Sequence, residues 1–175
     1  MPKKDSEELT ARLIAHVQQD TSDQFSESRF ESSSIYLDSD RWQQERQRLF
    51  FDSPQLIAFA AEVAQPNSYR TTESMGVPIV VTRDESSQLH AFVNACAHRG
   101  AEVASGYGEA RRLTCKFHGW SYDLGGRLRA MPDEQAFTID KSCHGLQRLP
   151  VSDNCGLIVV GLSDRVSQDK VDHFL

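Results

Sequence analysis

Two short segments that each carry one cysteine and one histidine constrain this chain more than any other feature. The first is Cys96-Ala97-His98-Arg99-Gly100 and the second is Cys115-Lys116-Phe117-His118-Gly119-Trp120. Each segment offers a thiolate and an imidazole, and a glycine follows each histidine. Glycine allows the positive φ or the close backbone approach that a chain needs when it wraps around a bound group. Each segment follows a predicted strand, so two loops at one end of a sheet could meet at a shared centre.

Two cysteines and two histidines can hold either of two metal centres. Structural zinc favours knuckles of like ligands, with Cys-x2-4-Cys or His-x3-5-His spacing. Mixed Cys/His pairs on two loops instead suit a [2Fe–2S] cluster, with thiolates on one iron and imidazoles on the other. The residues alone therefore favour iron–sulfur chemistry, and a zinc-stabilised structural or interaction domain remains the alternative.

The pattern of these residues resembles that of the Rieske proteins. In detail it is similar to the N-terminal domain of the α (large) subunit of aromatic-ring-hydroxylating Rieske non-haem iron oxygenases. The motifs that carry the resemblance are Cys-x-His-Arg-Gly, Cys-x-x-His-Gly-Trp-x-Tyr-Asp, a following Gly-Gly turn and Pro132. The resemblance implies a Rieske-type [2Fe–2S] cluster in which Cys96 and Cys115 ligate one iron and His98 and His118 ligate the other.

The resemblance also implies where the reduction potential of the cluster lies. Two ferric ions, two sulfides, two thiolates and two neutral imidazoles sum to zero charge, so an electron adds more easily than to a four-thiolate cluster. Rieske proteins of respiratory complexes carry a loop disulfide and a serine that this chain replaces with Ala101, Phe117 and Trp120. Tyr122 is then the remaining side chain able to donate to a ligand sulfur. Fewer donors stabilise the reduced cluster less, which predicts a low potential of the oxygenase kind.

The chain before residue 53 is expected to be an N-terminal helical arm, residues 1–52. Apolar residues recur at helical spacing over residues 5–20 and again over residues 40–51, and Pro54 ends the second helix. A loosely held connection rich in serine and acids separates the two helices.

Residues 53–175 are expected to form the cluster-bearing domain. Short β-rich runs alternate there with turn residues such as the Gly125-Gly126 pair, which is typical of an antiparallel sandwich or barrel. The fold class predicted is mainly β: a Rieske-type antiparallel β-sandwich with two cluster-binding loops and an N-terminal helical arm. The strands expected are residues 56–59, 68–71, 77–82, 89–93, 112–114, 120–123, 127–129 and 156–160.

Composition excludes several classes of function. The net charge of −6 with no basic block makes nucleic acid an improbable partner on electrostatic grounds. The mean hydropathy of −0.49 and the lack of a long apolar run argue against a membrane span. The N-terminus has lysines but no apolar stretch after them, so no secretory signal is expected. A cytoplasmic protein that uses its thiols for metal is the expectation.

The function implied is electron transfer within a larger oxygenase. Electrons would come from a ferredoxin or flavin reductase and pass to a mononuclear iron on a catalytic domain or a neighbouring α subunit. No two histidines lie within five residues of each other, so the two-His, one-carboxylate iron site of that family is not expected here, nor is hydroxylation by this chain alone. A free-standing Rieske ferredoxin is the alternative, although the helical arm favours the oxygenase.

Two further cysteines fall outside the motifs. Cys143 and Cys155 have no histidine pattern at ligand spacing, so we expect them to be buried or half-buried structural residues rather than ligands. Trp120 is expected to pack, with docking of a partner as a second role.

Overall fold

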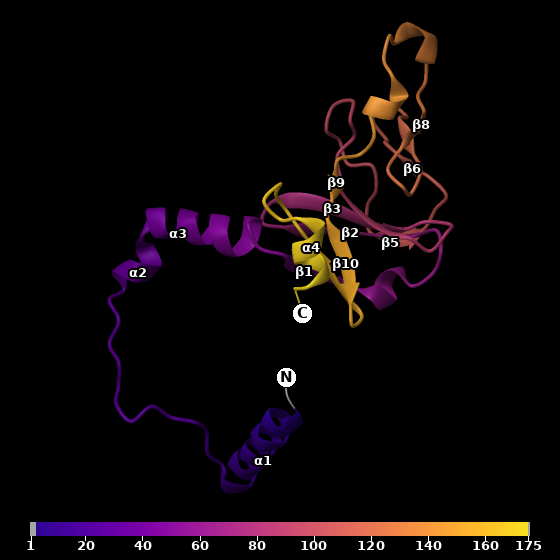
Figure 1. Ribbon diagram of the computed structural model, residues 1–175. Coiled ribbons are helices and arrows are strands. Elements are labelled where there is room, and N and C mark those ends of the chain that lie inside the picture. Colours follow the sequence, from indigo (N-terminus) through magenta and orange to yellow (C-terminus); the bar gives the residue numbers. More distant parts are fainter. Residues whose placement is uncertain (1–2, 175) are drawn as a thin grey trace. The chain divides into compact units, whose positions relative to one another are not determined.

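The computed structural model describes residues 3–174, and the chain divides into two compact units, residues 1–38 and 39–175. The first unit contains α1 (Lys3–Gln19) and the short α2 (Ser34–Leu37), joined by an extended connection (Figure 1). Helix α1 confirms the helix predicted over residues 5–20. Between residues 3 and 174 no helix is both long and apolar enough to cross a membrane.

The second unit begins with α3 (Ser39–Glu45), which continues into the π-helix η1 (Arg46–Phe51). The sequence predicts one regular helix over this stretch, and the structure differs in its last turns. The amide of Asp52 donates to the carbonyl of Gln47 at 2.8 Å, which is a bond across five residues and widens the helix end. The helical segment ends there, and Pro54 follows.

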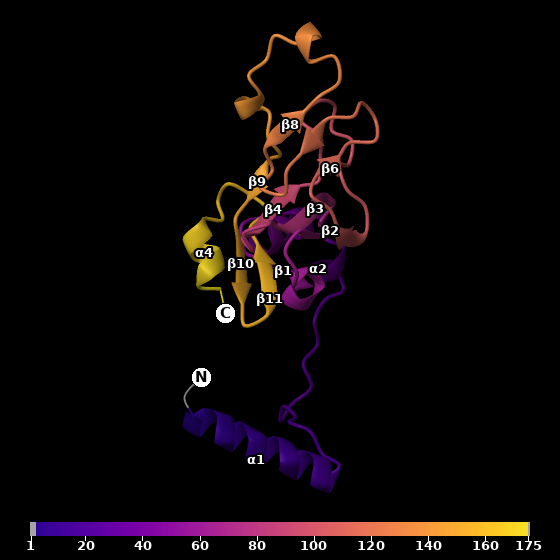
Figure 2. The ribbon, with the colours of Figure 1, turned by 90° about the vertical axis from the view of Figure 1, so that its right-hand side faces the viewer.

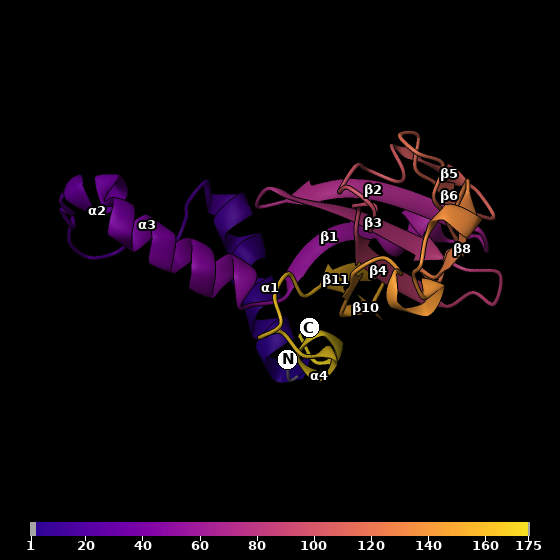
Figure 3. The same cartoon turned by 90° about the horizontal axis from the view of Figure 1, so that it is seen from above.

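Three antiparallel sheets make up the rest of the second unit (Figure 1, Figure 3). The largest has the strand order β5-β2-β3-β4-β9, and the other two have the orders β1-β11-β10 and β6-β7-β8. The strands are β1 (Gln55–Phe59), β2 (Ser68–Ser74), β3 (Val77–Arg83), β4 (Leu89–Val93), β5 (Tyr107–Glu109), β6 (Leu113–Thr114), β7 (Ser121–Tyr122), β8 (Leu128–Ala130), β9 (Arg148–Leu149), β10 (Val151–Asn154) and β11 (Leu157–Val160). Short helical segments complete the unit: η2 (Ala60–Val63), η3 (Glu134–Ala136), η4 (Lys141–Cys143) and α4 (Gln168–Asp172).

The mainly β, antiparallel class predicted from the sequence is confirmed, and each predicted strand overlaps an observed one. Strands β5, β9 and β10 were missed. They are two to four residues long and rich in polar residues and glycine, so they lack the apolar alternation that marks a strand in a sequence. Strands β5 and β9 form because β2 and β4, which are distant in the chain, pair with them, and β10 pairs with the strand that follows it, β11.

Strand β3 separates two hydrophobic cores. Alternate side chains of a strand point to opposite faces. Val80 therefore packs into the core that contains both predicted ligand cysteines, whereas Ile79 and Val81 pack into the core formed with β1 and β11. All three side chains are fully buried.

The turn between β7 and β8 fixes the small sheet that carries the second cysteine loop to the larger sheet (Figure 2). The buried hydroxyl of Thr82 on β3 donates to the carbonyl of Leu124 at 2.6 Å. Within the turn, Gly126 has φ +83°, and a methyl group added there would overlap the ring of Phe92. Its carbonyl accepts from the amide of Leu146 at 2.8 Å. The turn thus needs a glycine for both its backbone and its space.

We expect Gly126→Ala to lower the free energy of unfolding by about 3 kcal/mol, because strain and overlap add together. Gly156→Ala is the matched control, since Gly156 has φ +84° but nothing within 4 Å of the added carbon. The control should cost only about 1 kcal/mol, from backbone strain. Urea denaturation followed by circular dichroism measures both, and equal losses would contradict the overlap argument.

Candidate functional site

The first cysteine loop follows β4 and closes on itself through two backbone hydrogen bonds. The amide of Cys96 donates to the carbonyl of Ala101 at 2.8 Å, and the amide of Gly100 donates back to the carbonyl of Cys96 at 2.8 Å. Gly100 has φ +73°, which an L side chain adopts only with strain. The loop therefore turns sharply around the position of His98.

The second loop, between β6 and β7, repeats the same closure. The amide of Cys115 donates to the carbonyl of Trp120 at 2.9 Å, and the amide of Gly119 donates to the carbonyl of Cys115 at 3.0 Å. Gly119 also has φ +73°, and a Cβ there would lie 2.9 Å from Pro132 Cγ. The cysteine amide thus pairs five residues along the chain in both loops. Two segments of different sequence therefore build the same turn.

In these two loops the thiols of the predicted ligands are buried, and their imidazole rings lie beside each other nearer the surface. Cys96 and Cys115 are 4% and 2% exposed, and neither forms a disulfide. The ring centroids of His98 and His118 lie 4.8 Å apart. His98 is half-buried and His118 is exposed. The site therefore presents an imidazole edge to the surface and keeps its sulfur atoms in the core.

An aromatic ring covers each histidine. Trp120 stacks on His98 with centroids 5.0 Å apart and planes 9° apart, and Phe137 meets both rings edge-on. Phe117 stacks on His118 with centroids 4.0 Å apart. Trp120 is 3% exposed whereas Phe117 is 61% exposed. Packing of Trp120 is confirmed, and Phe117 rather than Trp120 is the aromatic ring available to a partner.

The environment of His98 favours its neutral form. Desolvation, followed by the positive charges of His118 and Arg99, holds the pKa of His98 below its usual value. A neutral imidazole is the form that binds metal ions.

Tyr122 on β7 reaches across to the first loop. Its hydroxyl lies 3.2 Å from Cys96 Sγ and accepts from the amide of Ala97 at 3.0 Å. Burial of the ring, together with the hydrogen bond to Cys96, raises the pKa of Tyr122 well above its usual value, so the hydroxyl stays protonated. A thiolate at Cys96 has no hydrogen to give, so Tyr122 donates to it.

Asn94 is a structural residue of the site that the sequence analysis missed. Its side chain is buried, its Nδ2 donates to the carbonyl of Ala104 at 2.9 Å, and its Oδ1 accepts from the amides of Val103 and Ala104. It therefore holds the return of the first loop against the end of β4. A polar residue that ends an apolar strand two positions before the cysteine is the signal that could have found it.

The two remaining cysteines lie outside this arrangement. Cys143 and Cys155 are both exposed, so the expectation that they are buried or half-buried was wrong. Cys155 occupies the turn between β10 and β11 with φ +52°. Cys143 ends η4, where an adjacent Asp140 side chain accepts from the amide of Ser142.

The chemistry of this donor set fits a two-iron cluster. A [2Fe–2S] cluster takes two protein ligands at each iron, soft thiolates and borderline imidazoles being suitable donors. The site offers two buried thiols and one pair of adjacent imidazole rings. Across residues 3–174 no three His, Cys, Asp or Glu side chains are grouped as around a single ion.

Comparison with known proteins agrees with this geometry. Residues 53–150 match the family of the Rieske [2Fe-2S] domain. The chain is 32% identical over 144 residues to the carnitine monooxygenase oxygenase subunit of Acinetobacter pittii (strain PHEA-2), which covers 80% of this chain and 39% of that protein. It is 35% identical over 148 residues to the anthranilate 1,2-dioxygenase large subunit of Burkholderia cepacia, covering 79% and 34% respectively.

Solved structures agree as well. The quaternary ammonium Rieske monooxygenase CntA in complex with L-carnitine superposes with a TM-score of 0.71 at 32% identity, over 76% of this chain and 38% of that one. Naphthalene 1,2-dioxygenase with indole bound gives a TM-score of 0.69 at 25% identity, over 76% and 31%. The chain spans no more than 39% of the length of these four relatives. Its resemblance is to their electron-transfer domain, whose cofactor is a Rieske-type [2Fe–2S] cluster, and the chain belongs to the Rieske [2Fe–2S] domain family.

Proposed function

We propose that Cys96 and Cys115 hold one iron of the cluster and that His98 and His118 hold the other. The observation that supports this assignment is the repeated closure of the two loops, which between them carry two buried free thiols and two adjacent imidazole rings. Residues 53–175 would then be the cluster-bearing domain and residues 1–52 its helical arm.

The residues around the site have separate tasks in electron transfer. A bound cluster supplies one-electron chemistry. The core excludes water from the thiolates, and Tyr122 stabilises charge on Cys96 through its hydrogen bond. The exposed ring of His118, with Phe117 stacked on it, offers a surface route from the site to an acceptor.

We further propose that the chain acts as the Rieske part of an oxygenase α subunit. A ferredoxin or flavin reductase would supply electrons, and a mononuclear iron on a catalytic domain or neighbouring α subunit would receive them. The monooxygenase and dioxygenase subunits to which the chain is similar support this assignment. The free thiols of Cys143 and Cys155 suit a reducing compartment, so we place the protein in the cytoplasm.

Metal analysis tests the ligand assignment. Purified protein should contain about two irons and about two acid-labile sulfides per chain, with a Rieske-type EPR signal after reduction. Cys96→Ser and Cys115→Ser should each abolish the cluster, since a serine hydroxyl does not ionise at neutral pH. Cys143→Ser is the matched control and should keep full iron and sulfide. Stoichiometric zinc without sulfide in the wild-type protein would refute the assignment.

The potential of the cluster tests the role of Tyr122. The wild-type midpoint should lie below zero, towards about −150 mV. Tyr122→Phe should lower it by about 40 mV, the equivalent of about 1 kcal/mol for one lost hydrogen bond in a one-electron couple. Tyr107→Phe is the control, because Tyr107 is 76% exposed and should leave the midpoint unchanged. Protein-film voltammetry measures all three, and an unchanged midpoint in Tyr122→Phe would show that the hydroxyl does not act on the sulfur.

Turnover experiments test whether hydroxylation requires a separate catalytic domain. Reduced, cluster-loaded protein of residues 1–175 should reoxidise in air without hydroxylating aromatic acids, because the acceptor iron is proposed to lie on a separate catalytic domain. Mass spectrometry after incubation with oxygen and a panel of substrates detects phenols and diols. Product formed over multiple turnovers would mean that this chain holds a second metal site.

A further inference from the structure

A basic groove lies beside the β7–β8 turn, outside the predicted cluster ligands. It has a volume of about 460 Å³, and its charged lining residues are Arg127, Arg129, Lys141 and Arg148. No acidic side chain from residues 3–174 lines it. A cluster of four cations is unusual in a chain with a net charge of −6, and it creates a local field opposite to that of the whole protein.

Two of these four charges are neutralised by neighbouring carboxylates. Arg129 Nε pairs with Asp123 at 2.7 Å, and Lys141 Nζ pairs with Glu134 at 2.6 Å. These two pairs are partly exposed, and they leave little net charge at their positions. The excess positive charge of the groove therefore resides on the other two residues.

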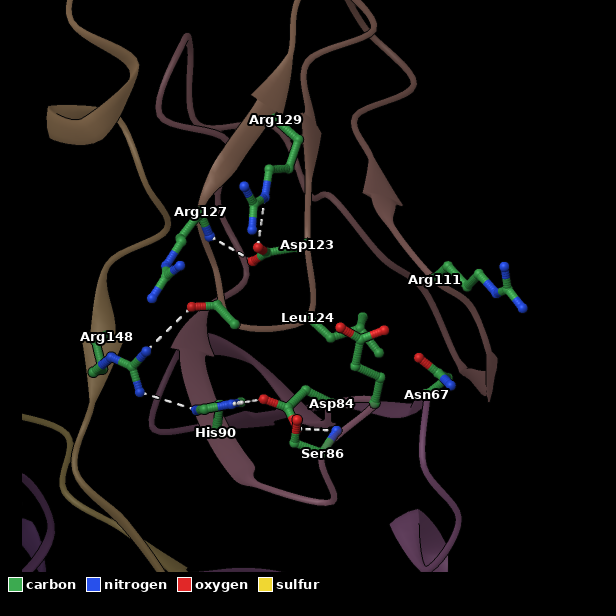
Figure 4. A pocket seen from close by; sticks show the side chains of 12 residues that line it. Asn67, Asp84, Ser86, His90, Arg111, Asp123, Leu124, Arg127, Arg129 and Arg148 are labelled. Carbon is green, nitrogen blue, oxygen red and sulfur yellow. Dashed lines mark hydrogen bonds and ion pairs between the residues drawn. The ribbon is translucent and has the colours of Figure 1, made fainter.

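The charge of Arg148 is not neutralised by a carboxylate, because its two hydrogen-bond partners are neutral groups. Its guanidinium donates to His90 Nδ1 at 3.0 Å and to the carbonyl of Gly125 at 3.1 Å (Figure 4). A guanidinium only donates, so His90 Nδ1 must carry a lone pair, and His90 Nε2 donates to Asp84 at 2.8 Å. His90 is thus a neutral ring in this arrangement. The remaining N–H groups of Arg148 stay available to a ligand.

Arg127 is exposed and has no ion-pair partner within the described part of the chain. Arg127 and Arg148 both line the groove. Both also line the neighbouring pocket that Figure 4 shows. Two guanidinium groups without ion-pair partners in one groove repel each other. An anion that binds both of them therefore lowers their electrostatic energy. The neighbouring pocket, of about 300 Å³, is also lined by Arg111 and by the acidic side chains of Asp84, Glu85 and Asp123.

The apolar wall of the groove leads to the thiol side of the site. Phe92 and Leu146 line the groove, and both belong to the buried core that contains Cys96 and Cys115. The guanidinium of Arg148 lies over the ring of Phe92, 5.2 Å from its centroid. The groove thus shares two residues with the core that contains the thiols, whereas the exposed His118 ring offers a different surface.

We propose that this groove is the docking site of an acidic electron-donor protein, whose carboxylates pair with Arg127 and Arg148. The donor loses one electron and the cluster gains it, and no bond or proton is exchanged. Docking there leaves the His118 edge free for the acceptor, so donor and acceptor need not compete for one surface. This inference rests on the proposed function, because it assumes a bound cluster.

Stopped-flow reduction by an acidic plant-type [2Fe–2S] ferredoxin tests the proposal. Arg127→Glu should slow reduction about tenfold at low salt, with Arg127→Lys close to wild type. The difference should vanish as salt is raised to about 0.5 M, where screening removes it. Lys170→Glu is the control of equal charge change, since Lys170 on α4 is exposed and its Nζ donates to the carbonyl of Arg165. Binding of oxidised ferredoxin, measured by calorimetry, should weaken about tenfold in Arg127→Glu and stay unchanged in Lys170→Glu.

The controls distinguish a loss of ferredoxin docking from a general loss of folding or of cluster function. Reduction by the methyl viologen radical cation, which needs no acidic contact, should be no slower in Arg127→Glu than in wild type. Equal slowing with both reductants, equal slowing in Lys170→Glu, or an unchanged ferredoxin rate in Arg127→Glu would each overturn the docking site. A wild-type protein without iron and sulfide would instead overturn the proposed function, and ferredoxin binding by calorimetry would still report on the groove.

Discussion

The hydroxyl of Tyr122 joins the two cysteine loops, and the geometry of the site depends on that link. Tyr122 belongs to the small sheet of the second loop, yet it contacts the thiol of Cys96 and the amide of Ala97 in the first. The ring is fully buried, so these contacts form in a medium where a hydrogen bond is stronger than in water. The small sheet itself is held to the larger one at the β7–β8 turn, by the bond from Thr82 to Leu124. The phenol and the turn thus add to the backbone closures of the two loops in placing the thiols.

Burial differs between the two halves of the site, and this difference has a chemical meaning. The thiols lie in the core behind β3, while the imidazoles lie at the surface between Trp120 and Phe117. A thiolate in an apolar core needs hydrogen-bond donors to be stabilised, which Tyr122 supplies. A surface imidazole needs no such support and remains open to a partner. Under the proposed assignment, the fold separates the buried thiolates from the histidines that would pass electrons outward.

The sequence predicts the local parts of this structure and misses those that depend on distant partners. The cysteine loops are encoded within six residues each, so spacing and glycines suffice to find them. Strands such as β3 are long and β-branched, whereas β9 is two residues long and forms only because β4 pairs with it. The exposure of Cys143 and Cys155 was missed because a cysteine carries no pattern that fixes its burial. The role of Asn94 was missed because its acceptors and donors lie nine and ten residues away.

The basic groove illustrates the same limit for function. Arg127, Arg129, Lys141 and Arg148 are spread over twenty-two positions of an acidic chain, and in sequence they form no basic block. The β7–β8 turn and the return of the chain to β9 bring them to one place. Whether each charge is neutralised is set by partners as distant as His90, fifty-eight residues from Arg148. The net charge of the chain argues against a polyanion as a general partner. The fold nevertheless gathers enough positive charge in the groove to contact an anionic group there. The negative charge on the rest of the protein repels an acidic partner that approaches in another orientation. The net charge of the protein therefore favours the orientation in which the partner meets the groove.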